Sequence, residues 1–354
     1  MVSFFLNFLF FCLSSDINTC CCKRKPIPFL SSLTDKKINI CVSKDALMID
    51  GKIFKRVYDI ENLPDIVDSG GFIFGIDNNT FNSIFNNKKN IIPNFNKYFG
   101  DLRKQQYIFA VLEDDNSNCY IIHCKITENN AEFFSSRSDL KRIKIIKSNK
   151  ITNCKLMFNG CSSLESLDLN GLDTSEVTDM SEMFNECTNL VSVDLSNLNV
   201  SKVTTTESMF KYCENLKSVV LGDSNFSSVT NMQNMFAYCT GLEELDLSKL
   251  KAPNLTDTFA MFYNCTSLKS INLCNLNAPN LERISFMFSN CCELKSLNLL
   301  SFETNCKIKS DSIFSNCSSL KTIKIDMTKN KTLYDQTKLD YIFDKSTNTS
   351  VRKY

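Results

Sequence analysis

The stretches MFNECTNLVSVDL at residues 183–195 and MFAYCTGLEELDL at residues 235–247 are nearly identical in pattern. Further copies lie before, between and after them, so that a copy begins every 26 residues. Each copy holds a Met-Phe pair, which is Ile-Phe in the last copy, then a cysteine and a leucine at fixed distances. The seven cysteines are Cys161, Cys187, Cys213, Cys239, Cys265, Cys291 and Cys317. Seven units without an insertion predict a protein whose units stack on one another.

A degraded eighth unit precedes the seven. Phe134, Arg137 and Leu140 keep the spacing, but an arginine stands where the other units have cysteine. A terminal unit has no neighbour against which to bury its outer face, so this departure from the pattern predicts a cap.

Each unit contains an alternating apolar segment. Leu164-x-x-Leu167-x-Leu169 places every second residue on one side, which is typical of a short strand. Stacked units would set neighbouring strands about 4.8 Å apart and form a continuous core.

The segment before each strand has helical spacing, i, i+3, i+4 and i+7. In the second unit this spacing falls on Met180, Met183, Phe184 and Cys187. The expected N-terminal signals are an N-cap at Thr178 and capping boxes at Thr204-x-x-Glu207 and Thr230-x-x-Gln233. We therefore expect an α/β repeat solenoid with a short parallel strand and a short helix in each unit.

The phrase VTDMSEMFNECTNLVSVDLS at 177–196 resembles the BspA-type leucine-rich repeat, a 26-residue surface-protein repeat of mycoplasmas, other bacteria and some protists. The resemblance covers residues of about 130–330. It implies a right-handed leucine-rich-repeat horseshoe. It also implies a surface or secreted protein that acts in adhesion or protein–protein interaction, because family members are commonly of that kind.

The residues between the leucines face outward, onto the expected concave sheet. This strand face is the predicted surface for a protein or glycan partner. Its candidate binding residues are Glu165, Asp168, Asp194, Lys217, Glu243, Glu244, Asp246, Lys269, Asn272, Lys295, Asn298, Lys321 and Lys324. Lys269, Lys295 and Lys321 share one column, which predicts either lysines that splay into water or an anionic partner.

The cysteine column allows two interpretations. A disulfide or metal array is one, but seven is an odd number and a single column does not converge on a tetrahedral site. The other is that cysteine acts as a small buried apolar residue, and we favour it. Outside the repeats, Cys119, His123 and Cys124 lie close together, but strand parity separates the two cysteines, so we expect no metal or cofactor.

The chain divides into five expected parts: a signal-like hydrophobic segment at 1–15, a linker at 16–37, a small mixed α/β domain at 38–128, leucine-rich repeats at 129–327, and a C-terminal cap or tail at 328–354. The small domain contains two expected turns, Asp50-Gly51 and Asp114–Asn118.

The N-terminal run VSFFLNFLFFCL at 2–13 is too short to span a bilayer as a helix. It suits the core of a signal peptide, although no basic residue precedes it. Cys20-Cys21-Cys22 beside a basic run could instead be acylated. A segment with neither role remains a third alternative.

Composition narrows the class of protein. The formal net charge of +1 gives no general attraction to nucleic acid. A single histidine removes the commonest general base from almost the whole chain. We therefore expect a non-enzymatic interaction protein at the cell surface or secreted. A cytoplasmic scaffold using the same face is the alternative, and an enzyme site within 38–128 is a weaker third.

Overall fold

The computed structural model describes residues 106–126, 134–222, 225–273, 278–299 and 311–325, together with residue 276 and short pieces before and after these ranges. The chain forms two compact units. One comprises Met1–Lys125 and Lys144–Asn149, and the other comprises Ile126–Ile143 and Lys150–Tyr354. The N-terminal run 2–13 lies outside the described residues. Within the described part of the chain, no helix has the length and apolar character needed to cross a membrane.

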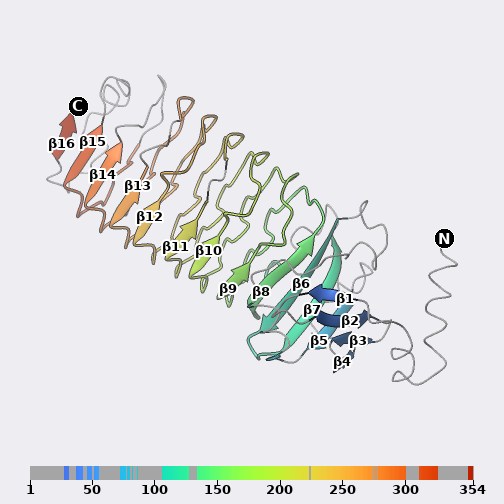
Figure 1. Ribbon diagram of the computed structural model, residues 1–354. Coiled ribbons are helices and arrows are strands. Elements are labelled where there is room, and N and C mark those ends of the chain that lie inside the picture. The colour runs from blue at the N-terminus through green and yellow to red at the C-terminus, as the bar shows by residue number, and fades with distance from the viewer. Residues whose placement is uncertain are drawn as a thin grey trace, which may run out of the picture. The chain divides into compact units, whose positions relative to one another are not determined.

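The first unit is built from antiparallel strands (Figure 1). Its first sheet has the strands β1 (Pro28–Ser31), β2 (Lys37–Val42), β3 (Ala46–Ile49) and β4 (Lys52–Lys55) in that order. Ile49 pairs with Lys52, which confirms the hairpin predicted at Asp50-Gly51.

The second sheet of this unit contains β5 (Phe72–Ile76), β7 (Cys119–Ile126), β6 (Gln106–Asp114) and β8 (Leu140–Ser148) in that order. The predicted turn between β6 and β7 is present, since the Asp114 N–H donates to the Asn118 carbonyl at 3.0 Å. Cys119 is buried and its thiol lies 2.9 Å from Asn78 Oδ1. The side chains of His123 and Cys124 lie outside the described residues.

The second unit is a β-solenoid with a period of 26 residues. Its short parallel strands are β9 (Ser166–Asp168), β10 (Ser192–Asp194), β11 (Ser218–Val220), β12 (Glu244–Asp246), β13 (Ser270–Asn272), β14 (Ser296–Leu299), β15 (Thr322–Ile325) and β16 (Ser350–Lys353). They line one side of the stack (Figure 1). We number the coils 1 to 7 after the strands β9 to β15. On another side, a ladder of five parallel bridges joins coils 1 to 6, from Asn153 to Arg283.

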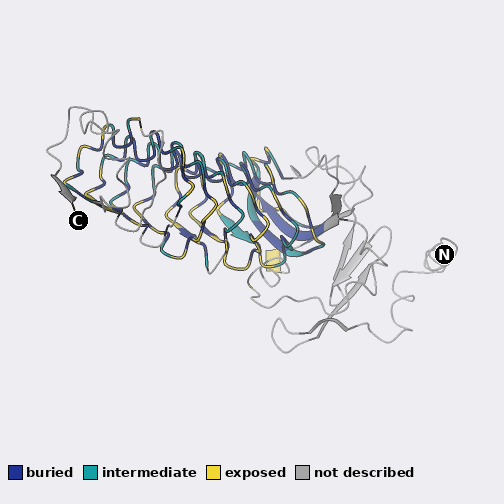
Figure 2. Ribbon diagram, turned by 90° about the horizontal axis from the view of Figure 1, so that it is seen from above, coloured by how far each residue is buried: buried dark blue, intermediate teal, exposed yellow. Residues whose placement is uncertain are grey.

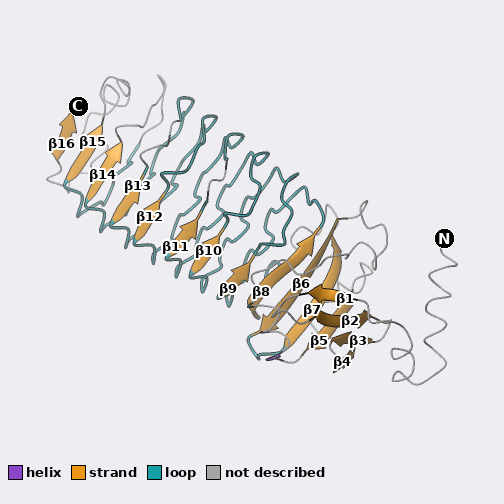
Figure 3. Cartoon of the chain, in the orientation of Figure 1, coloured by secondary structure: helices purple, strands orange, loops and turns teal. Residues whose placement is uncertain are grey.

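The predicted helices are wrong. The segments that carry the helical spacing are pairs of tight turns, drawn as loops in Figure 3, and the described residues of the repeats contain no helix. In coil 2 the N–H groups of Met183 and Cys187 donate three residues back, to Met180 and Phe184. The N–H groups of Phe184 and Glu186 instead donate to the next coil, as Phe184 does to the Met209 carbonyl at 2.9 Å. A helix would satisfy these groups within one segment, whereas here they join the coils.

Left-handed residues cause this difference. Each coil places two residues at positive φ, four positions apart, such as Glu182 (φ 56°) and Glu186 (φ 61°) in coil 2. A left-handed residue ends a helix. The predicted N-cap residue Thr178 instead accepts a hydrogen bond through its carbonyl from the Thr204 hydroxyl at 3.0 Å, and Thr230 and Thr256 continue this ladder.

The core consists of columns that run along the stack, and Figure 2 shows buried and exposed segments alternating around each coil. One column is a stack of phenylalanine rings with neighbouring centroids 5.1–5.7 Å apart and nearly parallel planes. The members of this Phe column are Phe134, Phe158, Phe184, Phe210, Phe236, Phe262, Phe288 and Phe314.

The degraded unit joins the Phe column, as the sequence predicted. Phe134 is fully buried and stacks on Phe158 at 5.1 Å. Arg137, in the place of the cysteine, binds both carboxylate oxygens of Asp139, at 2.7 and 2.5 Å. Burial would raise the pKa of Asp139, but the hydrogen bonds and charge of Arg137 outweigh it and lower that pKa.

One substitution at a left-handed position should change the stability in opposite directions in the observed tight turns and in the helix that the sequence predicted. Glu186→Gly removes a side chain from a left-handed position that is Gly160, φ 70°, in coil 1. Relief of about 1–2 kcal/mol of backbone strain exceeds the entropy cost of glycine, so we expect a gain of about 0.5–1 kcal/mol. In a helix the same change would lose about as much. Urea denaturation measures the difference, and a loss of stability would contradict the turn geometry.

Candidate partner-binding face

The 13 predicted binding residues lie together on or directly beside the strands of the solenoid, as expected from the outward positions. In β10 and β12 the burial pattern is exposed, buried, exposed, so the residues before and after the central one point away from the core. We call the outward residues of β9–β15, with the residue before each, the strand face. Ten of the 13 residues are exposed, and Asp168, Lys269 and Lys324 are half-buried.

The aspartates of this face have a structural task. Asp194 Oδ1 accepts a hydrogen bond from the Ser196 N–H at 2.8 Å, and Asp246 does the same with Ser248 at 2.8 Å. Asp168 accepts from the Asn170 N–H at 3.0 Å. These bonds close the turns after β9, β10 and β12, and the bonds from Ser248 hold the pKa of Asp246 below its ordinary value. The aspartates therefore shape the turn as well as charging the face.

Lysines of the strand face and of the neighbouring β8 make contacts with adjacent strands or coils. Lys269 Nζ lies 2.6 Å from the Glu243 carboxylate, one coil back, and Lys141 Nζ lies 3.3 Å from Glu165. The hydrogen bond from Lys269 lowers the pKa of Glu243, and its counterpart raises the pKa of Lys269. Lys217 Nζ donates to the Gly241 carbonyl at 2.8 Å. Lys269 therefore does not splay into water as one of the two interpretations of the lysine column predicted, because it pairs with Glu243 of the preceding coil.

Two exposed apolar side chains on this face, Val191 and Val220, were not among the predicted binding residues. Val191 is 48% exposed and Val220 is 50% exposed, and they are the exposed large hydrophobic residues of the described chain. They occupy outward positions in adjacent coils 2 and 3. The signal was present in the sequence, since the equivalent positions of the other coils hold charged or amide side chains.

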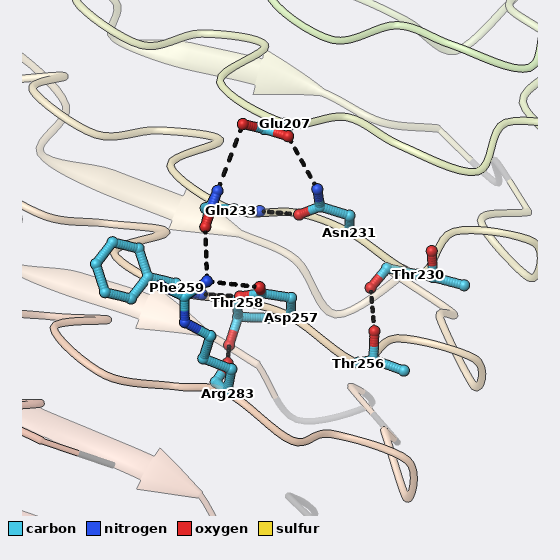
Figure 4. Close-up of polar contacts among 9 residues, drawn as sticks. All are labelled: Glu207, Thr230, Asn231, Gln233, Thr256, Asp257, Thr258, Phe259 and Arg283. Carbon is cyan, nitrogen blue, oxygen red and sulfur yellow. Dashed lines mark hydrogen bonds and ion pairs between the residues drawn. The ribbon is translucent and has the colours of Figure 1, made fainter. Parts of the chain in front are cut away.

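The bridge ladder forms a second polar face, on which Glu207, Asn231, Gln233, Asp257 and Arg283 bind one another (Figure 4). Arg283 Nη1 lies 3.0 Å from Gln233 Oε1 and 3.2 Å from Asp257 Oδ2. Asn231 Nδ2 donates to Glu207 at 3.0 Å.

An aromatic contact completes this network. The Arg283 guanidinium lies 4.1 Å from the centre of the Phe259 ring. Because these groups satisfy one another across four coils, from Glu207 in coil 3 to Arg283 in coil 6, the face acts as a structural clamp. The residues named in two predicted capping boxes, Glu207 and Gln233, belong to this clamp.

The cysteines follow the interpretation that we favoured. All seven are free and buried. Each thiol donates to the carbonyl of a Phe-column residue one coil back, at 3.0–3.2 Å, as Cys213 does to Phe184. Among the described residues, no group of three or more His, Cys, Asp or Glu side chains could hold a metal ion.

The second compact unit of the chain is therefore a leucine-rich-repeat-like β-solenoid. The family model described as "Mycoplasma protein of unknown function, DUF285" matches residues 128–242 and 215–328, more than half of the chain. The chain belongs to this family.

A search of curated proteins finds no match. Among solved structures, the chain is similar to a leucine-rich repeat protein from Bacteroides ovatus, with 20% sequence identity and a TM-score of 0.32. The match covers 54% of this chain and 57% of that one, so the chain spans little more than half of that protein's length.

Proposed function

We propose that the solenoid is a non-catalytic binding module whose strand face takes a protein or glycan partner. The observation that carries this proposal is the exposure of Val191 and Val220 among charged and small polar side chains. A partner gains from covering apolar side chains, and charged neighbours supply specificity. The polar face on the bridge ladder is a less suitable binding surface, because its polar groups are already paired with one another.

We further propose that this module works at the cell surface or after secretion. The BspA-type resemblance and the hydrophobic run at 2–13 support this location. Sequencing of the mature N-terminus tests it. A start near Asp16 on a protein outside the cell supports export, whereas a retained Met1 in the cytoplasm would favour an intracellular scaffold that uses the same face.

A photo-crosslinking residue on the strand face tests the binding surface. Ser218 is exposed and lies in β11, the strand that ends in Val220. Replacing Ser218 with benzoylphenylalanine should give a crosslinked species on target cells that excess unlabelled protein competes away. Val191→Ser with Val220→Ser should weaken the crosslink at least about fivefold, because the apolar contact is lost without a change of charge.

The matched control carries the same photo-crosslinker at Glu282, an exposed position away from the strands. It should give no competed species. Crosslinks of equal strength from Ser218 and Glu282, or crosslinks that the double serine variant leaves unchanged, would contradict the proposed surface. Treatment of the cells with glycosidases separates a glycan partner from a protein partner.

A further inference from the structure

The charges of the strand face are divided along the stack. The outward positions of coils 1 to 4 hold six carboxylates and one lysine, whereas those of coils 5 to 7 hold four lysines and no carboxylate. The acidic half contains Glu165, Asp168, Asp194, Glu243, Glu244 and Asp246, with Lys217. The basic half contains Lys269, Lys295, Lys321 and Lys324.

A face that is acidic at one end and basic at the other is complementary to itself after a half-turn. A two-fold axis lying in the contact plane and parallel to the strands reverses the order of the coils and keeps the columns in register. The acidic half of one copy then meets the basic half of the other. Two-fold interfaces of identical chains require this self-complementarity.

One register places no like charges opposite one another in coils 1 to 6. With the axis between β11 and β12, coil 1 faces coil 6 of the second copy, coil 2 faces coil 5, and coil 3 faces coil 4. Glu165 then lies opposite Lys295, and Lys217 opposite Glu243, each twice by symmetry. Like charges do not meet at the outward positions of these coils. The middle column is serine in coils 1, 2, 3, 5 and 6, so the two faces can approach closely.

We propose that the strand face binds a second copy of this chain, with the two stacks antiparallel, the acidic coils 1 and 2 of each copy against the basic coils 6 and 5 of the other, and coil 3 against coil 4. This proposal rests on the strand face as the binding surface of the proposed function and names a partner for it.

The size of the face fixes the expected strength. Seven strands about 4.8 Å apart span roughly 30 Å, and three outward columns span roughly 10 Å. The resulting footprint of roughly 300 Å² is below the roughly 800 Å² per partner of stable complexes. The association is therefore weak and electrostatic, and it should respond strongly to salt.

Sedimentation equilibrium of the full chain tests the proposal. At about 0.5 mM protein we expect dimers at about 20 mM salt and monomers at about 500 mM salt, where the screening length is only a few ångströms. Lys295→Glu or Glu165→Lys alone should weaken the dimer at least about tenfold, since each places like charges opposite one another twice. An equimolar mixture of the two variants should restore the dimer, and so should the double variant.

The controls are Lys251→Glu and Glu282→Lys, which reverse exposed charges away from the strand face. They should leave the dimer unchanged. A wild-type monomer at low salt, a dimer indifferent to the reversals at residues 165 and 295, or a mixture that stays monomeric would overturn the proposal. So would a monomer that binds heparin through the lysine half. In each case the photo-crosslinks from Ser218 still decide separately whether the face binds another partner.

Discussion

Raising the pH from 9 to about 10.5 is expected to unfold the solenoid through its seven buried thiols. Burial raises the pKa of each above its ordinary value of 9.0, to about 12 for Cys161, Cys265 and Cys317 and well above 9.0 for the other four. The thiolate is disfavoured because the column is enclosed by apolar side chains and each S–H donates to a carbonyl.

The loss of folding stability with rising pH follows from proton linkage. A group whose pKa is higher in the folded state contributes its full stability below the unfolded pKa and loses it as the pH rises toward the folded value. Above pH 9 the unfolded chain releases the seven protons while the folded chain retains them. At pH 10 each thiol costs about 1.4 kcal/mol of stability, so seven cost about 10 kcal/mol. That is comparable with the whole stability of an ordinary domain.

Urea denaturation at a series of pH values measures this loss. Cys213→Ala with Cys239→Ala provides the matched control, because the carbonyls that accept these thiols, those of Phe184 and Phe210, keep backbone hydrogen bonds. The slope of stability against pH above 9 should become shallower by about 3 kcal/mol per pH unit. An equal slope in the variant would show that other groups cause the alkaline loss.

Much of the solenoid could be predicted because each core column repeats one residue type. Leu190, Val193 and Leu195 define the buried side of a strand by alternation alone. The residues between them could therefore be predicted to face outward. The turns were predicted as helices because i, i+3, i+4 and i+7 spacing also fits two consecutive tight turns. At one left-handed position the sequence carried a signal, since it is Gly160, Asn264, Asn290 or Asn316 in four of the seven coils.

The contacts of the strand face were harder to predict. Whether Lys269 splays into water or turns to Glu243 depends on the side-chain geometry between coils, which the column of lysines does not encode. The Asp-x-Ser pattern at the ends of β10 and β12, Asp194 with Ser196 and Asp246 with Ser248, was the available signal for a turn-closing aspartate. The clamp around Arg283 joins residues 26 and 50 positions apart, so a helical interpretation of the segment concealed it.

Phe236→Ala is expected to destabilise the solenoid by about 3–5 kcal/mol. The ring is fully buried and stacks between Phe210, at 5.4 Å, and Phe262, at 5.6 Å. Its removal leaves a cavity between two coils and breaks both stacking contacts. Because each coil is stabilised mainly by its neighbours, the loss should also separate the stack into two shorter cooperative parts.

Phe226→Ala provides the comparison, because Phe226 is buried to the same degree but lies outside the Phe column. Both changes lose similar apolar area, so the difference between them measures the stacking, about 0.5–1.5 kcal/mol for each ring pair. Thermal and urea unfolding of the two variants give this difference. Equal losses would assign the stability of the Phe column to burial alone, and a loss below about 1 kcal/mol for Phe236→Ala would contradict the stacked core.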